Sequence, residues 1–140
     1  MDLISVIIPY YKKKKFIDYS IKSIFDQTHS NLEIIIVYDD ENKLELKYLK
    51  ETYGGDKRIK FLINDVNIGA GYSRNKGMEI ANGEFISFLD ADDVWEKNKI
   101  QTQLLFMKKN KLSVTHTSYK IIDEKNNLLG SRIARDFSSI

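Results

Sequence analysis

The 140-residue sequence contains no cysteine, a single proline, only two histidines and no long hydrophobic run. The lack of cysteine excludes disulfide bonds, thiolate catalysis and cysteine-based zinc sites, and it suits a reducing cytoplasm, where we expect the protein. A membrane-spanning helix needs roughly 20 successive apolar residues, so none is expected. The N-terminus enters its first hydrophobic run behind the acidic Asp2, which is not typical of a secretory signal peptide.

The sequence also has little net charge, because 22 basic side chains oppose 20 acidic ones and leave a formal charge of +2. This balance provides no general attraction to nucleic acid, and no nucleic-acid partner is expected. One local excess is the run Lys12-Lys13-Lys14-Lys15. It would either steer an anionic ligand or make peripheral contact with an acidic membrane, at the inner face of that membrane. Such runs more often form a solvated loop, which is the interpretation we favour.

The sequence does contain short apolar segments that alternate with segments of helical spacing. This alternation predicts an α/β fold, a Rossmann-like and mainly parallel sheet flanked by helices, with residues 1–140 forming one domain. Pro9 is expected to end the first strand, and Asn82-Gly83 to cap the third helix. Strands are predicted at 3–8, 32–38, 58–63, 84–89 and 112–118, and a hairpin at 119–133. Helices are predicted at 16–25, 70–81 and 94–109, with a short one from Leu44 that stops at Gly54-Gly55.

Carboxylates follow the fourth predicted strand directly, as Asp90, Asp92 and Asp93. Ligands of such sheets bind outside the carboxyl ends of the strands, and carboxylates this close together repel one another. A divalent cation, Mg²⁺ or Mn²⁺, removes that repulsion and bridges carboxylates to substrate phosphates. We therefore expect Asp90 and Asp92 to bind a metal and a diphosphate. Asp93 has a structural alternative that we prefer, as the N-cap of a helix from Val94.

The ends of the second and third strands carry further polar residues. Asp39 and Asp40 end the second strand, where one of them would start an Asx turn and the other would accept a hydrogen bond from a nucleobase or ribose. We assign the turn to Asp40 and the base to Asp39. Gly69 and Gly71 precede a predicted helix as in nicotinamide-binding loops, but Arg74 stands in place of the third glycine. Arg74 is expected to meet a phosphate, or otherwise to pair with one of the aspartates.

Taken together, these segments resemble the family 2 inverting glycosyltransferases of the GT-A fold, from residue 3 to about 100 and more loosely from 114 to 130. The resemblance implies a nucleotide-diphosphate sugar donor, often UDP-linked, and single displacement with inversion. It also implies that Pro9 and Tyr10 line the nucleoside pocket. Apart from the resemblance, we prefer packing as the role of the tyrosines, with stacking of Tyr10 and Tyr11 on the base as the alternative that their place at a strand end leaves open. The matching segments are Ser5–Pro9, Ser23–Thr28, Glu33–Asp40, Asn67–Gly69, Ser73–Asn75, Ala81–Ile86 and Phe88–Trp95.

The sequence departs from this family at two places along the donor edge. The usual Asp-Asp-Gly-Ser reads Asp-Asp-Glu-Asn at 39–42, and Lys12 stands where the family often has asparagine. The general base of an inverting transferase, which accepts the proton of the acceptor hydroxyl, comes from a later segment in the family. The acidic pair Asp123-Glu124 lies in a predicted hairpin tip and is not assigned to this role.

We therefore expect an N-terminal, donor-binding part whose general base lies beyond Ile140, since residues 135–140 do not resemble a finished domain end. The expected acceptor is a glycan or a lipid-linked glycan. Two alternatives stay open at this point: a non-catalytic sugar-nucleotide-binding module and a nucleotidyltransferase. The second is disfavoured because Pro9-Tyr10-Tyr11-Lys12 occupies the place of a glycine- and arginine-rich phosphate loop.

Overall fold

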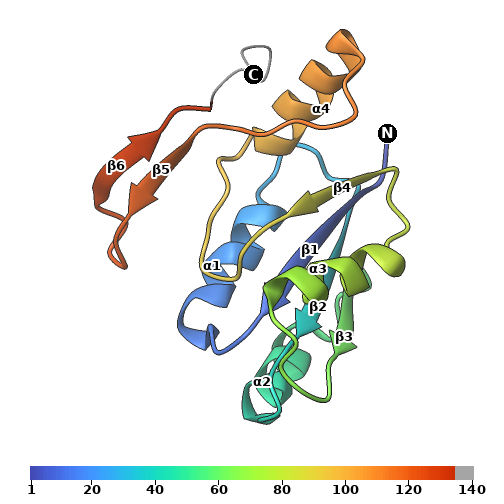
Figure 1. The fold of residues 1–140 in the computed structure, drawn as a ribbon, viewed down its shortest axis with the longest axis vertical. Coiled ribbons are helices and arrows are strands. Elements are labelled where there is room, and N and C mark those ends of the chain that lie inside the picture. The colour runs from blue at the N-terminus through green and yellow to red at the C-terminus, as the bar shows by residue number, and fades with distance from the viewer. Residues whose placement is uncertain (135–140) are drawn as a thin grey trace. The chain divides into compact units, whose positions relative to one another are not determined.

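The computed structural model describes residues 1–134, so the predicted unfinished end at 135–140 lies outside the described residues. The chain divides into two compact units, Met1–Lys99 and the part from Ile100 onward. No helix in residues 1–134 is long and apolar enough to cross a membrane. The elements in chain order (Figure 1) are β1 (Ile4–Tyr10), α1 (Lys14–Phe25), β2 (Leu32–Tyr38), α2 (Leu44–Tyr53), β3 (Ile59–Ile63), α3 (Ala70–Glu79), β4 (Phe85–Phe88), α4 (Lys99–Asn110), β5 (Tyr119–Ile122) and β6 (Leu128–Arg132).

The first unit contains a four-stranded sheet of order β3-β2-β1-β4, in which every neighbouring pair is parallel. All seven residues of β1 and all seven of β2 are buried. This burial explains their nearly continuous aliphatic sequence, because central parallel strands are covered on both faces. The predicted α/β fold with a mainly parallel sheet is confirmed.

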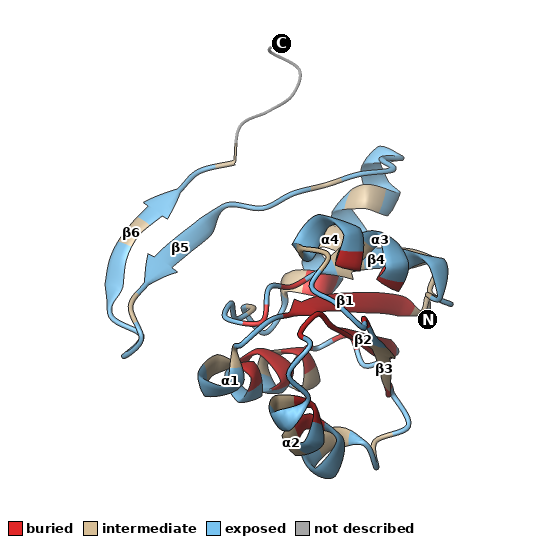
Figure 2. Ribbon diagram, turned by 60° about the horizontal axis from the view of Figure 1, so that its bottom comes forward, coloured by how far each residue is buried: buried red, intermediate tan, exposed pale blue. Residues whose placement is uncertain are grey.

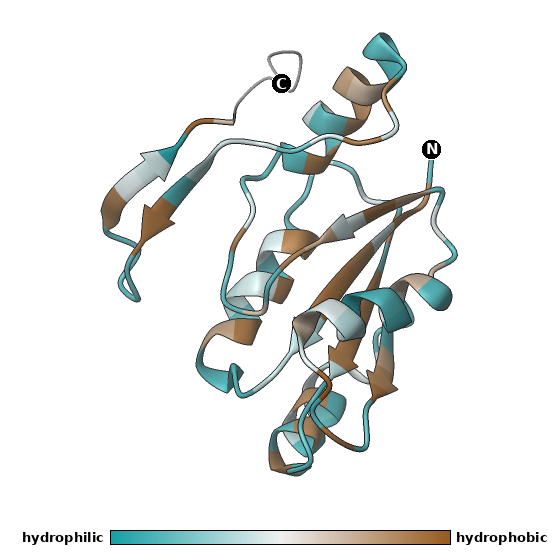
Figure 3. Ribbon diagram, in the orientation of Figure 1, coloured by the Kyte–Doolittle hydropathy of each residue, from teal (hydrophilic) through white to brown (hydrophobic). Residues whose placement is uncertain are grey.

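Helices cover both faces of this sheet, with α1 and α2 on one face and α3 on the other (Figure 2). α1 turns Ile17, Ile21 and Ile24 inward, and the apolar strands form the hydrophobic centre of the unit (Figure 3). α3 approaches more closely than a larger residue would allow, because a Cβ at Gly77 would lie 2.6 Å from Cγ2 of Ile7. The glycine therefore lets the helix backbone rest on the strands.

Pro9 does not end β1, contrary to prediction. The strand continues to Tyr10, which pairs with Tyr38 of β2. Along β1 the backbone groups of successive residues point alternately towards β2 and towards β4. Ile7 points towards β4, because its carbonyl accepts the amide of Leu89. Pro9 faces the same side two residues later, beyond the point where β4 has left the sheet. Its missing N–H therefore costs no ladder hydrogen bond.

The segment Asn82-Gly83 does not cap α3 either, because that helix ends at Glu79 with Ile80 as its C-cap. Gly83 is instead pressed against the start of β1. A Cβ there would lie 2.6 Å from the backbone nitrogen and the Oγ of Ser5, and 2.8 Å from the Leu3 carbonyl oxygen. This glycine is required for close approach of two backbones rather than for a turn.

The second unit contains most of α4 and the antiparallel hairpin β5-β6. The hairpin prediction is confirmed. The strand predicted at 112–118 is wrong, because none of these residues is paired with a described strand. The fourth helix was also predicted to start too early, since α4 begins at Lys99 rather than at Val94.

Candidate functional site

The strand order brings the polar strand ends together, because β1 lies between β2 and β4. β2 follows β1 to its last residue, Tyr10, whereas β4 leaves the sheet opposite Ile7. The turn that starts at Asp90 therefore lies next to the last residues of β1, which follow Ile7. The predicted convergence of Pro9, Asp39 and Asp90 at one edge of the sheet follows from this register.

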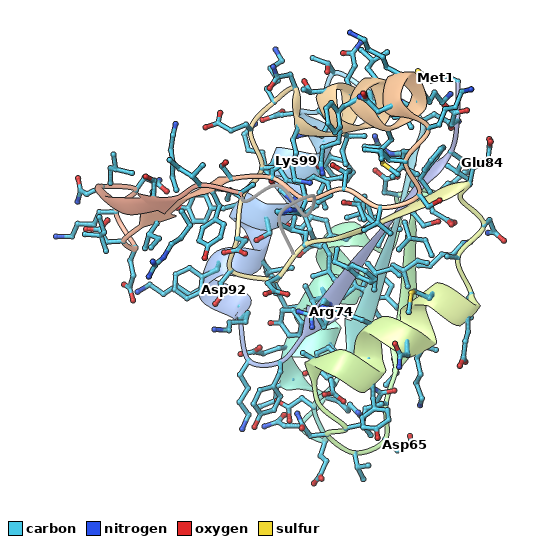
Figure 4. All side chains as sticks on the ribbon, turned by 45° about the horizontal axis from the view of Figure 1, so that its top comes forward. Met1, Asp65, Arg74, Glu84, Asp92 and Lys99 are labelled. Atoms are coloured by element: carbon cyan, nitrogen blue, oxygen red, sulfur yellow. The ribbon has the colours of Figure 1, made fainter. Side chains whose placement is uncertain are left out.

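Each carboxylate of the Asp90-Ala91-Asp92 turn carries a basic partner. Arg74 of α3 donates from Nη2 to Oδ1 of Asp90 at 2.6 Å, and Lys13, just before α1, donates from Nζ to Oδ2 of Asp92 at 2.6 Å. Arg74 and Asp92 are both labelled in Figure 4. The side chains of both carboxylates are more than a third exposed. Such exposed pairs contribute only up to about 1 kcal/mol each, so a ligand can replace either partner at small cost.

Lys13 belongs to the candidate site, and the sequence analysis considered it only as one of the four lysines at 12–15. We expected the lysine run to be a solvated loop, but only part of it is. Lys13 pairs with Asp92, while Lys14 and Lys15 lie over the rings of Tyr48 and Phe16. Only its position in the sequence pointed to Lys13 as part of the site. The lysine run follows the carboxyl end of the first strand, and the carboxyl ends of all the parallel strands lie at the same edge of the sheet.

Asp93 is not a helix N-cap, contrary to our prediction, because α4 starts six residues later at Lys99. Its backbone N–H instead donates to the carbonyl of Asp90 and closes the turn. Desolvation, and then the negative charges of Asp90 and Asp92, raise the pKa of Asp93. Three carboxylates in one turn thus form a concentrated negative charge.

These residues fit a divalent cation only in part. Their donor atoms are hard carboxylate oxygens, which Mg²⁺ and Mn²⁺ prefer. Residues 1–134 contain no group of three or more histidine, cysteine or acidic side chains arranged to hold an ion. One or two carboxylates are nevertheless what a metal needs when substrate phosphates supply further ligands. Asp90 and Asp92 therefore suit a shared site better than a complete protein cage.

The carboxylate of Asp39 is buried and fully engaged. Oδ1 accepts hydrogen bonds from Nδ2 of Asn64 at 2.9 Å and from the amide of Ile68 at 2.8 Å, and Oδ2 accepts the amide of Gly69 at 2.8 Å. Asn67 adds a side-chain hydrogen bond to the Asp39 carbonyl. Gly69 has a φ of 85°, which favours glycine, and it immediately precedes α3. Asp39 therefore fixes the start of the helix that carries Arg74.

Asp40 forms the Asx turn that we predicted, with Oδ1 accepting the amide of Asn42 at 3.0 Å. No residue within 1–134 donates a hydrogen bond to its Oδ2. Lys43 reinforces the same loop, because its Nζ donates to the carbonyls of Asp40 and Asn64. Asn64 is a second residue that the sequence did not single out, and it connects the ends of β2 and β3.

Tyr10 packs inside the fold, which is the interpretation that we preferred, and its ring is not presented to a ligand. The residue is fully buried, and its ring stacks on Tyr38 with centroids 5.4 Å apart. Its hydroxyl donates to Oε2 of Glu45 at 2.5 Å. Burial, followed by this hydrogen bond, raises the pKa of Tyr10. Tyr11 is 45% exposed, with Lys12 over its ring.

Comparison with curated proteins identifies relatives across nearly the whole chain. It is 38% identical over 133 residues to an Escherichia coli protein named UDP-Glc:alpha-D-GlcNAc-diphosphoundecaprenol beta-1,3-glucosyltransferase WfgD, covering 94% of this chain and 51% of that protein. It is 36% identical over 120 residues to the putative teichuronic acid biosynthesis glycosyltransferase TuaG of Bacillus subtilis, covering 86% and 48%. The chain thus spans about half the length of these relatives.

Solved structures share the fold. The S. aureus TarS 1–349 crystal structure matches with a TM-score of 0.69 and 28% identity over 79% of this chain and 33% of that one. The TarS complex with UDP-GlcNAc matches with a TM-score of 0.69 and 24% identity over 87% and 40%, which is evidence for the fold alone. The predicted GT-A fold is thereby confirmed. The sequence model for Glycosyl transferase family 2 matches residues 5–138, and the chain belongs to that family.

Proposed function

We propose that this chain is the donor-binding part of a glycosyltransferase that uses a nucleotide-diphosphate sugar, UDP-linked, and transfers the sugar to an acceptor hydroxyl with inversion. The observation that carries the proposal is the pairing of Asp90 with Arg74 and of Asp92 with Lys13 at the carboxyl edge of the sheet. Two acidic and two basic side chains at one edge match a diphosphate together with its cation. Glycosyltransferase names among the relatives support the same reaction class.

In this proposal Asp90 and Asp92 hold Mn²⁺ or Mg²⁺ together with the donor diphosphate. The ion, when bound, stabilises the negative charge that develops on the departing nucleoside diphosphate. Lys13 and Arg74 then exchange their aspartate partners for phosphate oxygens, which accept charge-assisted hydrogen bonds equally well. Because both pairs are exposed and weak, this exchange costs little.

The nucleoside is proposed to lie at the ends of β1 and β2, where the buried Pro9 and Tyr10 shape the pocket from beneath and offer no exposed ring for stacking. Asp39 was our candidate for the base, but all three of its described carboxylate hydrogen bonds hold the loop before α3. We now propose that Asp39 acts indirectly, by placing that loop. The Oδ2 of Asp40 is the carboxylate oxygen to which no residue in the described part of the chain donates, so we propose it for the base N–H.

We propose that the general base lies beyond Ile140. The late carboxylate of Asp123 is unsuited to this role because it accepts the amides of Lys125 and Asn127 and the side-chain amide of Asn127. A base must be free to take a proton from the acceptor hydroxyl. The proposed acceptor is a glycan or lipid-linked glycan, by analogy with the diphosphoundecaprenol named for the relative WfgD.

Calorimetric titration with UDP- and GDP-sugars, with and without Mn²⁺, tests this function. Wild-type protein is expected to bind the UDP-sugar more tightly with Mn²⁺. Asp92→Asn keeps the side-chain volume but removes the charge, so it should abolish the metal-dependent gain. Asp56→Asn is a suitable control, because Asp56 pairs with Arg58 just before β3 and lies outside the proposed site. Binding that needs no metal and survives Asp92→Asn would refute the proposal.

A further inference from the structure

The segment between β4 and α4 has no regular secondary structure at 93–96, yet its backbone is held firmly by α1. The Oγ of Ser20 donates to the carbonyl of Ala91 at 3.0 Å. Ser20 is fully buried and Ala91 is 2% exposed, so this hydrogen bond is shielded from water. Ala91 is the residue between the two proposed ligands, Asp90 and Asp92. The helix is thus attached to the turn at its centre.

Two more side chains continue the attachment, one further along α1 and one just after the helix. The Oγ of Ser23 accepts the amide of Trp95 at 3.1 Å and donates to the Ser20 carbonyl at 2.8 Å. Nε2 of Gln27 donates to the carbonyl of Glu96 at 2.9 Å, and the residue is buried. The bonds to Trp95 and Glu96 satisfy backbone groups that lie outside any helix or strand.

The amide of Thr28 completes the series by donating to the carbonyl of Lys97 at 3.0 Å. Ser20 and Ser23 are three residues apart, so they share one face of α1, and Gln27 follows just after the helix ends at Phe25. Ile17, Ile21 and Ile24 form the buried apolar face of the same helix. α1 therefore covers the sheet and also bonds the 91–95 backbone, and Gln27 and Thr28 just after it bond Glu96 and Lys97.

We infer that Ser20, Ser23 and Gln27 are positioning residues for the Asp90 and Asp92 carboxylates. This inference rests on the proposed function, because it names the side chains that hold the proposed metal and diphosphate site in place. A turn without these bonds would sample other conformations, and binding would then have to order it again. The inference also gives a role to the Ser23–Thr28 segment, whose residues have no charged or nucleophilic chemistry of their own at the site.

The test compares serine variants in a calorimetric titration of UDP with and without Mn²⁺. Losing one buried hydrogen bond to the turn is expected to weaken Mn²⁺-dependent UDP binding by about five- to tenfold in Ser20→Ala and Ser23→Ala. Ser23→Thr restores the hydroxyl at a half-buried position and should bind within about twofold of wild type.

The matched control is Ser5→Ala. Ser5 is equally buried, donates to Oε1 of Glu33 at 2.5 Å and accepts the amide of Gly83 at 2.8 Å, but it lies at the opposite end of the strands. Ser5→Ala should lower the melting temperature at least as much as Ser20→Ala does, yet leave the Mn²⁺-dependent affinity unchanged. This comparison separates loss of positioning from general loss of stability.

Amide hydrogen exchange without ligand provides an independent measurement. Ser20→Ala and Ser23→Ala should speed exchange at residues 93–97 and leave β1 and β2 protected, whereas Ser5→Ala should not affect 93–97. If wild type gains affinity with Mn²⁺ and Ser20→Ala behaves like Ser5→Ala in both measurements, the positioning role is refuted while the proposed function stands. If wild-type protein shows no Mn²⁺-dependent UDP binding, the proposed function fails and this role fails with it.

Discussion

Replacing Glu33 by glutamine would remove the charge from a buried carboxylate at the amino end of the sheet. Glu33 is 7% exposed, and Oε1 accepts the Oγ–H of Ser5 at 2.5 Å and the amide of Asn82 at 2.6 Å. Oε2 accepts Nζ of Lys60 at 2.7 Å and Nδ2 of Asn82 at 3.2 Å. This one side chain therefore joins β1, β2, β3 and the segment that leads into β4.

The magnitude follows from the pKa of Glu33. Burial alone would raise this pKa, but the hydrogen bonds from Lys60, Ser5 and the Asn82 amide outweigh it and lower the pKa from 4.5 to about 2. Each pKa unit corresponds to about 1.4 kcal/mol between the two protonation states. Lys60 is 40% exposed, and solvent screens its share. We therefore expect the ionised carboxylate to contribute about 2–3 kcal/mol to the free energy of unfolding.

The pH dependence has a definite sign. Because the folded protein lowers the pKa of Glu33, this contribution is fully present above pH 4.5 and is lost as the pH falls from 4.5 towards 2. Urea unfolding at several pH values measures it as the difference between wild type and Glu33→Gln. That difference should be about 2–3 kcal/mol at pH 7 and should shrink steadily below pH 4.5.

Glu84→Gln provides the matched control, because Glu84 is an exposed glutamate of the same unit. Its substitution should change the free energy of unfolding by less than about 0.5 kcal/mol at pH 7. A wild-type minus Glu33→Gln difference that stays constant from pH 7 to pH 2.5 would show that the lost stability comes from shape or packing. The charge-based reasoning for Glu33 would then be wrong.

Two further substitutions test the backbone contacts. Asp39→Ala should lower the free energy of unfolding by about 2–3 kcal/mol, because it leaves the part-buried amides of Ile68 and Gly69 without an acceptor. Faster amide exchange at these two residues would locate the effect. Asp39→Asn keeps one oxygen and should cost less, so equal losses in the two variants would count against this account. Gly83→Ala should lower the free energy of unfolding, measured by thermal unfolding, by at least about 2 kcal/mol, because the new Cβ would lie 2.6 Å from the backbone of Ser5. An unchanged melting temperature would contradict this close contact.

The edge of the sheet that holds the site was predictable from the sequence. Buried parallel strands have continuous aliphatic runs, and residues 3–8 and 32–38 show this pattern. Once strands alternate with helices, the carboxyl ends of parallel strands fall on one side. Asp39 and Asp90 were placed there by this reasoning alone. Helix and strand ends were less predictable, as Pro9 illustrates, because a proline is tolerated wherever the neighbouring strand has already diverged.

Tertiary contacts decided what the segment after β4 does. Asp93 and Glu96 carry the local pattern of a capping box, yet the helix begins at Lys99. The amide of Trp95 and the carbonyls of Glu96 and Lys97 are bonded by residues of α1 and the segment after it. Because these backbone groups already have hydrogen-bond partners in another segment of the chain, they do not need the hydrogen bonds of a helix. No local pattern contains this information, because its partners lie about 70 positions earlier in the chain.

The sequence by itself determined that acidic side chains gather at the carboxyl edge of a parallel sheet, since strand direction and residue order fix that placement. Only the tertiary structure decided the state of each one. Asp39 is occupied by the amides before α3, whereas Asp90 and Asp92 remain exposed and paired with Arg74 and Lys13. The physical reason is that a carboxylate's partners depend on where distant backbone amides and cations come to lie, which only the folded chain defines.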